Sequence, residues 1–188
     1  YLNLSRTTYY RAVITNGVCA TAFSSVATIT VDNAATGGTL VGAATVCYGN
    51  NSGSLTLSGH SGTILGWESS LNNFATTGIP VANTTTTINY SNLLATTYYR
   101  AKLSCWTCGN VYSAIGVITV DVNTTWTGAV SNSWHNAANW SCGVVPTSDL
   151  NVAITAVTNQ PQITTSDAFA NSITFDATTT LLVSADNN

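Results

Sequence analysis

Cysteine is the residue type with the most chemistry in this chain, which holds five cysteines and no methionine. Thiolates form disulfides, bind zinc or act as redox centres, and Cys105-Trp-Thr-Cys108 has the CxxC spacing that serves all three. Zinc needs a complete tetrahedral set of ligands, and the sequence has no second CxxC and no close pair of histidines. We therefore expect disulfides, which are typical of secreted proteins, and no metal or other cofactor.

Tryptophan is the second candidate. Trp126, Trp134 and Trp140 lie close together in the sequence, with Asn136 and Asn139 between them. Exposed tryptophans beside amide side chains could form a platform for glycan contact. The alternative is that the three rings form the core of a small module that is poor in other large apolar residues. We favour the core interpretation, and the burial of the rings decides between the two.

The remaining polar residues do not form a catalytic pattern. His60 and His135 are isolated, and Glu68 is the single glutamate, so a metal site or catalytic triad would lack its carboxylates. Asp32 and Asp121 each end an ITVD stretch. We interpret both as strand-terminating residues, because calcium takes roughly six to eight oxygen ligands and acids are scarce here. The sequence predicts a protein that is not an enzyme.

Composition excludes several classes of protein. Only 6% of the residues are charged, against about 25% in typical proteins, whereas 45% are hydrophobic. The net charge of −3 offers no basic patch for nucleic acid or anionic lipid. No apolar run approaches the ~18 residues that a membrane span requires. We expect a folded protein with no nucleic-acid partner and no membrane span.

An internal repeat organises the elements that position these residues. The hexapeptide TTYYRA occurs at residues 7–12 and again at residues 96–101, and the same shift of 89 residues places Cys19 on Cys108. The repeat predicts three parts, the third of which could be incomplete. They are the C-terminal part of a truncated repeat (1–32), a complete repeat (33–122) and a distinct, Trp-rich module (123–188).

The repeat also predicts which cysteines pair. Each copy has one early and one late cysteine, so we expect Cys47 to bond Cys108, and Cys19 to bond a cysteine located before residue 1. Cys105 has no counterpart in the earlier copy. A bridge from Cys105 to Cys142 would fix the complete repeat to the next module; the alternative is a bond from Cys105 to Cys108.

Short strands bounded by turn residues are predicted throughout the complete repeat. Residues 54–58 alternate cleanly between polar and apolar, and about six or seven such segments surround Trp67. This pattern favours an Ig-like β-sandwich. In the last module, apolar segments at 151–155, 172–175 and 180–184 fit either a second sandwich or the first rungs of a β-solenoid. The predicted class is all-β, with tandem sandwiches followed by a second β-rich module.

Several long stretches carry a resemblance to a known family. ATVCYGNNSGSLTLSG, WESS and TTYYRA resemble the Ig-like repeats of large cell-surface gliding-motility adhesins of Bacteroidota, the SprB-like substrates of type IX secretion. TWTGAVSNSWHNAANWSCGVVPTSDLNVAI resembles the module that commonly follows those repeats. The resemblance covers nearly the whole chain. It implies export by the type IX system, a location at the exterior of the outer membrane, and a role in cell adhesion and gliding motility.

We therefore expect a structural or adhesive segment of a large secreted cell-surface protein, in which the repeats form an extended rod. The expected partners are other modules of the same chain, surface polysaccharide or another cell-surface protein. Two alternatives stay open. One is a carbohydrate-binding accessory region of a large secreted glycan-degrading enzyme, and the other is a subunit of an extracellular filament or fibre.

Overall fold

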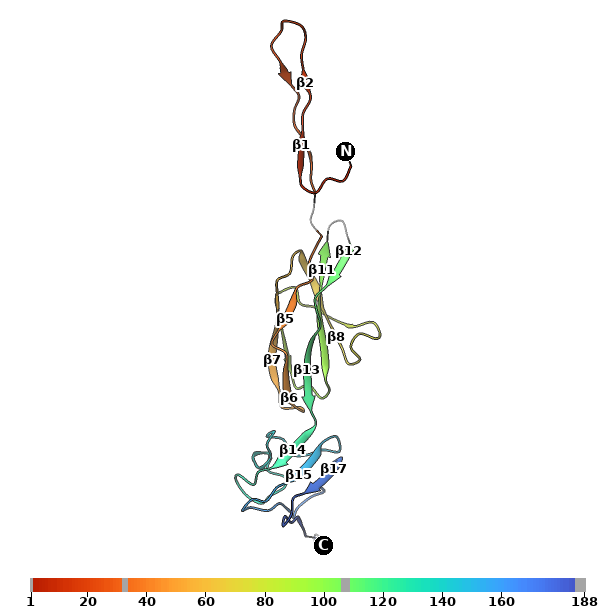
Figure 1. The fold of residues 1–188 in the computed structure, drawn as a ribbon. Helices are drawn as coiled ribbons and strands as arrows, with labels where there is room; N and C mark the ends of the chain where they lie inside the picture. The colour runs from red at the N-terminus through yellow and green to blue at the C-terminus, as the bar shows by residue number, and fades with distance from the viewer. Residues whose placement is uncertain (1, 32–33, 106–108, 185–188) are drawn as a thin grey trace.

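The computed structural model describes residues 2–31, 34–105 and 109–184, with the side chain of Cys105 excepted. These residues form β-strands, loops and a short 3-10 turn, η1 (Ala137–Asn139). Figure 1 shows an elongated molecule in which an N-terminal hairpin, a β-sandwich and a C-terminal module follow one another from one end to the other. The predicted all-β fold class is confirmed.

The N-terminal part is a long antiparallel hairpin in which β1 pairs with β4 and β2 pairs with β3. The strands are β1 (Thr8–Tyr10), β2 (Val13–Ile14), β3 (Ala22–Phe23) and β4 (Ala27–Ile29). Thr8 lies opposite Ile29, and their counterparts after a shift of 89 residues, Thr97 and Ile118, lie opposite each other in the sandwich. Both copies of TTYYRA therefore occupy the same strand in the same register.

The sandwich has two sheets, ordered β10-β7-β5 and β6-β13-β11-β8-β9, and β12 pairs with the far half of β11. Connections such as β7 to β8 and β10 to β11 cross from one sheet to the other, as in Ig-like folds. The strands are β5 (Thr39–Val41), β6 (Ala44–Cys47), β7 (Ser52–Ser58), β8 (Thr63–Ser70), β9 (Ile79–Val81), β10 (Thr87–Ser91), β11 (Thr97–Cys105), β12 (Gly109–Tyr112) and β13 (Gly116–Asp121).

The step from β5 to β6 moves the chain from the first sheet to the second. Gly42 lies at this step with a φ of 109°, and a Cβ at that position would collide with the carbonyl oxygen of Ser54. Only glycine adopts this positive φ and leaves room for the carbonyl oxygen without strain. As a result, β6 runs parallel to β13, and Cys47 lies opposite Asp121 at the end of the sandwich where the chain leaves for the next module.

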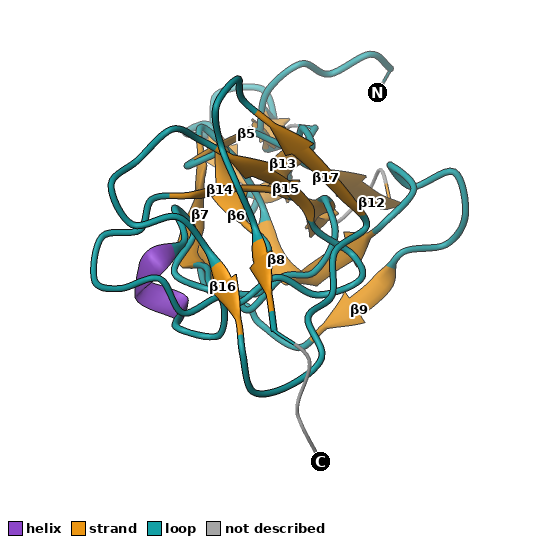
Figure 2. Cartoon of the chain, turned by 90° about the horizontal axis from the view of Figure 1, so that it is seen from below, coloured by secondary structure: helices purple, strands orange, loops and turns teal. Residues whose placement is uncertain are grey.

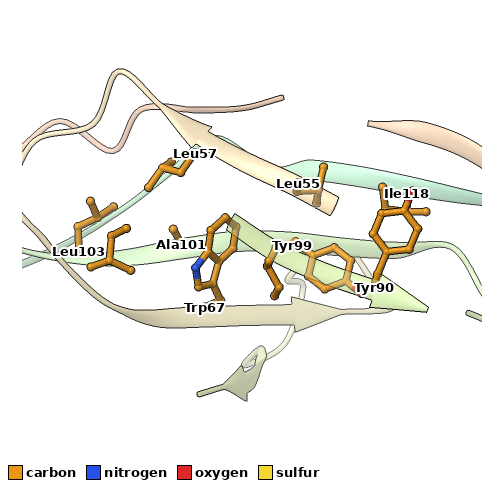
Figure 3. Close-up of a cluster of buried hydrophobic side chains, with 10 residues drawn as sticks. Leu55, Leu57, Trp67, Tyr90, Tyr99, Ala101, Leu103 and Ile118 are labelled. Carbon is orange, nitrogen blue, oxygen red and sulfur yellow. The ribbon is translucent and has the colours of Figure 1, made fainter. Parts of the chain in front are cut away.

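The core of the sandwich lies between the two sheets (Figure 3). Alternate residues of β7 are buried, so Leu55 and Leu57 face inward, and Ala101 and Leu103 of β11 do the same from the opposite sheet. Trp67 of β8 lies among them, and its indole N–H donates to the carbonyl oxygen of Thr85 at 3.0 Å. Burial of these side chains, at about 2 kcal/mol each, supplies the main driving force of the module.

The C-terminal module is built from stacked parallel strands. β14, β15 and β17 form one parallel sheet, and β16 and β18 form a second. Figure 2 looks along the long axis and shows β14, β15 and β17 on one side of the module and β16 on another. The strands are β14 (Asn123–Trp126), β15 (Asn151–Ile154), β16 (Gln162–Ile163), β17 (Ser172–Phe175) and β18 (Leu182–Val183).

This arrangement decides between the two alternatives for the last module. Each turn of the chain contributes one strand to the first sheet. On the side of the second sheet, Ser133 pairs in parallel with Gln162, and Gln162 with Leu182, in the same order. Successive turns that stack in parallel register are rungs of a β-solenoid. A second sandwich is therefore wrong for residues 123–184.

Candidate functional site

A disulfide between Cys47 and Cys142 joins the sandwich to the solenoid. Cys47 ends β6, and Cys142 follows the 3-10 turn, so the bond links residues 95 positions apart across the junction, with their Cα atoms 5.6 Å apart. The predicted pairs Cys47–Cys108 and Cys105–Cys142 are therefore wrong. The expectation of a bridge between the two modules was correct in kind, but Cys47 rather than Cys105 provides the sandwich thiol.

The topology explains the error. The repeat predicted pairing inside one module, but β6 lies beside β13, whose end leads directly into β14. Strands β11 and β12, which flank residues 106–108, meet at the opposite end of the sandwich (Figure 1). Cys108 and the side chain of Cys105 lie outside the described residues. Cys19 is an exposed free thiol, and its expected partner before residue 1 stays a prediction.

Polar contacts surround the disulfide. The hydroxyl of Tyr48 donates to Oδ2 of Asp149 at 2.9 Å, and Nδ2 of Asn50 donates to the carbonyl oxygen of Cys142 at 3.0 Å. The pKa of Tyr48 is raised, first because the carboxylate of Asp149 accepts its proton in that hydrogen bond. The junction therefore combines one covalent bond with two side-chain hydrogen bonds that come from the same turn of the sandwich.

A ladder of amide side chains runs from the junction down one edge of the solenoid. Nδ2 of Asn123 donates to Oδ1 of Asp121, and Nδ2 of Asn151 donates to Oδ1 of Asn123 at 3.2 Å. Nδ2 of Asn171 in turn donates to Oδ1 of Asn151 at 2.8 Å. Asp121 thus accepts from Asn123, two positions further along the chain, as expected for a strand-terminating acid, and Asp32 lies outside the described residues.

The three candidate tryptophans form the core of the first solenoid rung. Trp126, Trp134 and Trp140 are exposed by only 0%, 1% and 3%. Their rings meet edge to face, with centroids 4.9 Å apart for Trp126–Trp140 and 4.8 Å apart for Trp134–Trp140. Glycan contact through these rings is therefore wrong, because a sugar must reach an exposed ring face. Sequence spacing could not decide this, since it carries no information on burial.

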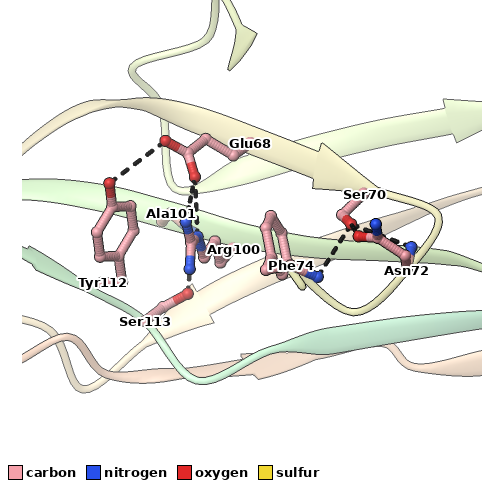
Figure 4. Close-up of polar contacts among 8 residues, drawn as sticks. All are labelled: Glu68, Ser70, Asn72, Phe74, Arg100, Ala101, Tyr112 and Ser113. Atoms are coloured by element: carbon pink, nitrogen blue, oxygen red, sulfur yellow. Dashed lines mark hydrogen bonds and ion pairs between the residues drawn. The ribbon is translucent and has the colours of Figure 1, made fainter. Parts of the chain in front are cut away.

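The arginine of the second TTYYRA copy is held between aromatic rings (Figure 4). The guanidinium carbon of Arg100 lies 4.1 Å from the ring centre of Phe74 and 3.9 Å from that of Tyr112, and Glu68 pairs with it at 2.7 Å. In the first copy, Arg11 stacks on Phe23, the counterpart of Tyr112 after a shift of 89 residues. In both copies, the arginine of TTYYRA therefore stacks on an aromatic ring of its own module.

We expect Arg100→Lys to lower the free energy of unfolding by about 1–2 kcal/mol, because an ammonium cannot stack flat between two rings while bonding Glu68 through two nitrogens. Tyr112→Phe is the matched control. It keeps the ring and removes only a 3.4 Å contact between the hydroxyl and Glu68, so it should cost less than about 0.5 kcal/mol. Urea unfolding measures both, and equal losses for the two variants would contradict a role for the stacked guanidinium.

His135 is close to a serine, but their geometry does not suit nucleophilic catalysis. Nε2 of His135 lies 3.1 Å from the hydroxyl of Ser166 and 3.1 Å from the backbone carbonyl oxygen of Asp167. A hydrogen bond to that carbonyl oxygen requires the tautomer with the proton on Nε2, and in that tautomer Nε2 cannot take a proton from Ser166. His60 lies in the turn after β7, and the described residues contain no cluster of His, Cys, Asp and Glu that could hold a metal ion.

The fold and the junction define the class of this chain as an Ig-like β-sandwich joined by a disulfide to a β-solenoid. Residues 1–33 and 36–124 match the family described as Domain of unknown function (DUF8696), and the chain belongs to that family. Residues 125–188 match a second family, described as Domain of unknown function (DUF8693). No curated protein matches the chain. None of the described helices is long and apolar enough to cross a membrane.

Proposed function

We propose that this chain is a structural segment of a large secreted cell-surface protein, in which it forms part of an extended rod that transmits force during attachment or gliding. The observation that carries the proposal is the disulfide between Cys47 and Cys142. A bond between consecutive modules is what a stiff, tension-bearing junction requires. The disulfide also fits an oxidising, extracellular location.

The position of the disulfide determines the path of force. Tension that enters from the N-terminal side reaches β6 and passes through the disulfide to Cys142, which lies in the solenoid. Residues 48–141, with strands β7 to β14, lie inside the loop that the disulfide closes. Most of the sandwich therefore carries no tension, and it stays folded while the rod is pulled.

The shape and surface of the molecule support the same proposal. The N-terminal hairpin and the C-terminal module lie at opposite ends of the long axis, with the sandwich between them (Figure 1), so the modules follow one another in a line. A charged content of 6% gives little electrostatic attraction to polyanions. The expected partners are thus other modules of the same chain and, at the cell surface, polysaccharide or another surface protein.

Single-molecule pulling from the two chain ends tests the proposal. When the oxidised chain is pulled, the segment between the two cysteines should not extend. After reduction of the disulfide, the fully extended chain should be longer by about 320 Å, because the segment spans 95 residues. The Cys19→Ser chain should be used throughout, since it removes the exposed free thiol. Release of the full length under oxidising conditions, at forces that leave covalent bonds intact, would overturn the proposed force path.

A further inference from the structure

The last rung of the solenoid leaves its inward-facing side chains uncovered. In parallel register, Ile173 of β17 follows Val152 of β15, and Phe175 follows Ile154. Val152 and Ile154 are exposed by 2% and 0%, whereas Ile173 and Phe175 are exposed by 40% and 51%. On the second sheet, Val183 of β18, which follows the core residue Ile163, is exposed as well. The two strands thus present an apolar surface that continues the stack of the core.

The amide ladder gives this surface a direction. Each amide donates through Nδ2 to the Oδ1 of the rung before it, in the order Asn171 to Asn151, Asn151 to Asn123 and Asn123 to Asp121. The carboxylate of Asp121 ends the ladder at the sandwich, because it accepts and cannot donate. At the other end, no hydrogen bond to Oδ1 of Asn171 is found within the described residues.

The opposite end of the solenoid is already covered. The outer edge of β14 pairs with residues 139–141, which bring Trp140 opposite Trp126. The Cys47–Cys142 disulfide then places the sandwich against that end. A second copy of the chain cannot stack its β14 rung on β17, because that rung is not accessible. Extension of the solenoid is therefore possible only at β17 and β18.

We propose that β17 and β18 form the docking surface for a further parallel rung of the same polypeptide. The rung places an apolar-x-apolar pair over Ile173 and Phe175, and an asparagine whose Nδ2 donates to Oδ1 of Asn171. The continuity of the stack and the direction of the ladder select this occupant over a second copy, whose own β17 would pair with this one in antiparallel orientation and break the ladder. This inference does not depend on the proposed role in force transmission.

The test adds a rung whose spacing the chain itself supplies. A second copy of residues 165–184 is appended after residue 184, because Asn151 and Asn171 are 20 residues apart, as are Gln162 and Leu182. Hydrogen exchange of the β17 and β18 amides is compared between this chain and the chain of residues 1–188. We expect exchange at residues 173–175 and 183 to slow by about tenfold or more when the added rung docks.

Two controls separate docking from added length. Ile173→Ser with Phe175→Ser, made in the appended copy only, should abolish the protection. Asn171→Asp in the appended copy should reduce it, because a carboxylate cannot donate to the amide oxygen above.

Unchanged exchange in the extended chain would overturn the proposal. So would protection of β17 in the chain of residues 1–188 through concentration-dependent dimerisation, which sedimentation velocity would detect. The pulling experiment is unaffected by either outcome.

Discussion

Removal of the junction disulfide by Cys47→Ser with Cys142→Ser should lower the free energy of unfolding of the sandwich by about 4.5 kcal/mol. The estimate follows from the 95-residue separation of the two cysteines, because a cross-link over a long segment removes much of the entropy of the unfolded chain. The double variant is preferred to either single one, since a remaining thiol could exchange with other cysteines. Urea unfolding followed by circular dichroism measures the loss.

The disulfide should also couple the two modules in unfolding. Trp67 reports on the sandwich and the Trp126 cluster reports on the solenoid. In the oxidised chain we expect fluorescence and circular dichroism to give coincident transitions, and in the double variant we expect them to separate. Cys19→Ser, which alters an exposed free thiol, should change stability by less than about 0.5 kcal/mol. A double variant as stable as the Cys19→Ser chain would show that the disulfide does not stabilise the junction.

Local pattern predicted the sandwich well, because its strands are antiparallel and half-buried. Alternation in residues 54–58 matches the buried Leu55 and Leu57 of β7, and the repeated TTYYRA matches two strands with the same register. The solenoid was harder to predict from local sequence pattern. β14, β15 and β17 are only four residues long each, and their parallel pairing depends on loops whose lengths differ from turn to turn.

The pairing of the junction disulfide was even harder to predict from local sequence pattern. Sequence reasoning singled out the correct residue type at the junction, but the pairing of Cys47 depends on the switch at Gly42 that places β6 beside β13. That switch needs a carbonyl from β7 at close range, which no local pattern reveals. The amide ladder was missed for a related reason. Its signal is an asparagine at the start of two successive strands, Asn123 and Asn151, and it has meaning only once the rungs are known to stack.

Asn139→Leu should lower the stability of the solenoid by about 3 kcal/mol, although leucine has nearly the same size. Asn139 is fully buried, and its side chain makes four hydrogen bonds. Oδ1 accepts from the backbone N–H groups of Val130 and Ser131 at 2.9 and 3.0 Å, and Nδ2 donates to the hydroxyl of Ser131 and the carbonyl of Ser133. Leucine would remove all four of these partly buried hydrogen bonds at once.

The loss should appear in the loop that closes the first rung, since all four partners lie in residues 130–133, directly before Trp134. Asn139→Asp should cost an intermediate amount, because it keeps both accepted bonds and loses both donated ones. Asn136→Ala is the matched control from the same turn. It removes a single exposed bond to the N–H of Ala138, so it should cost less than about 1 kcal/mol. Thermal unfolding monitored by tryptophan fluorescence ranks the three variants, and a loss for Asn139→Leu no larger than that for Asn136→Ala would show that the buried amide does not hold the loop.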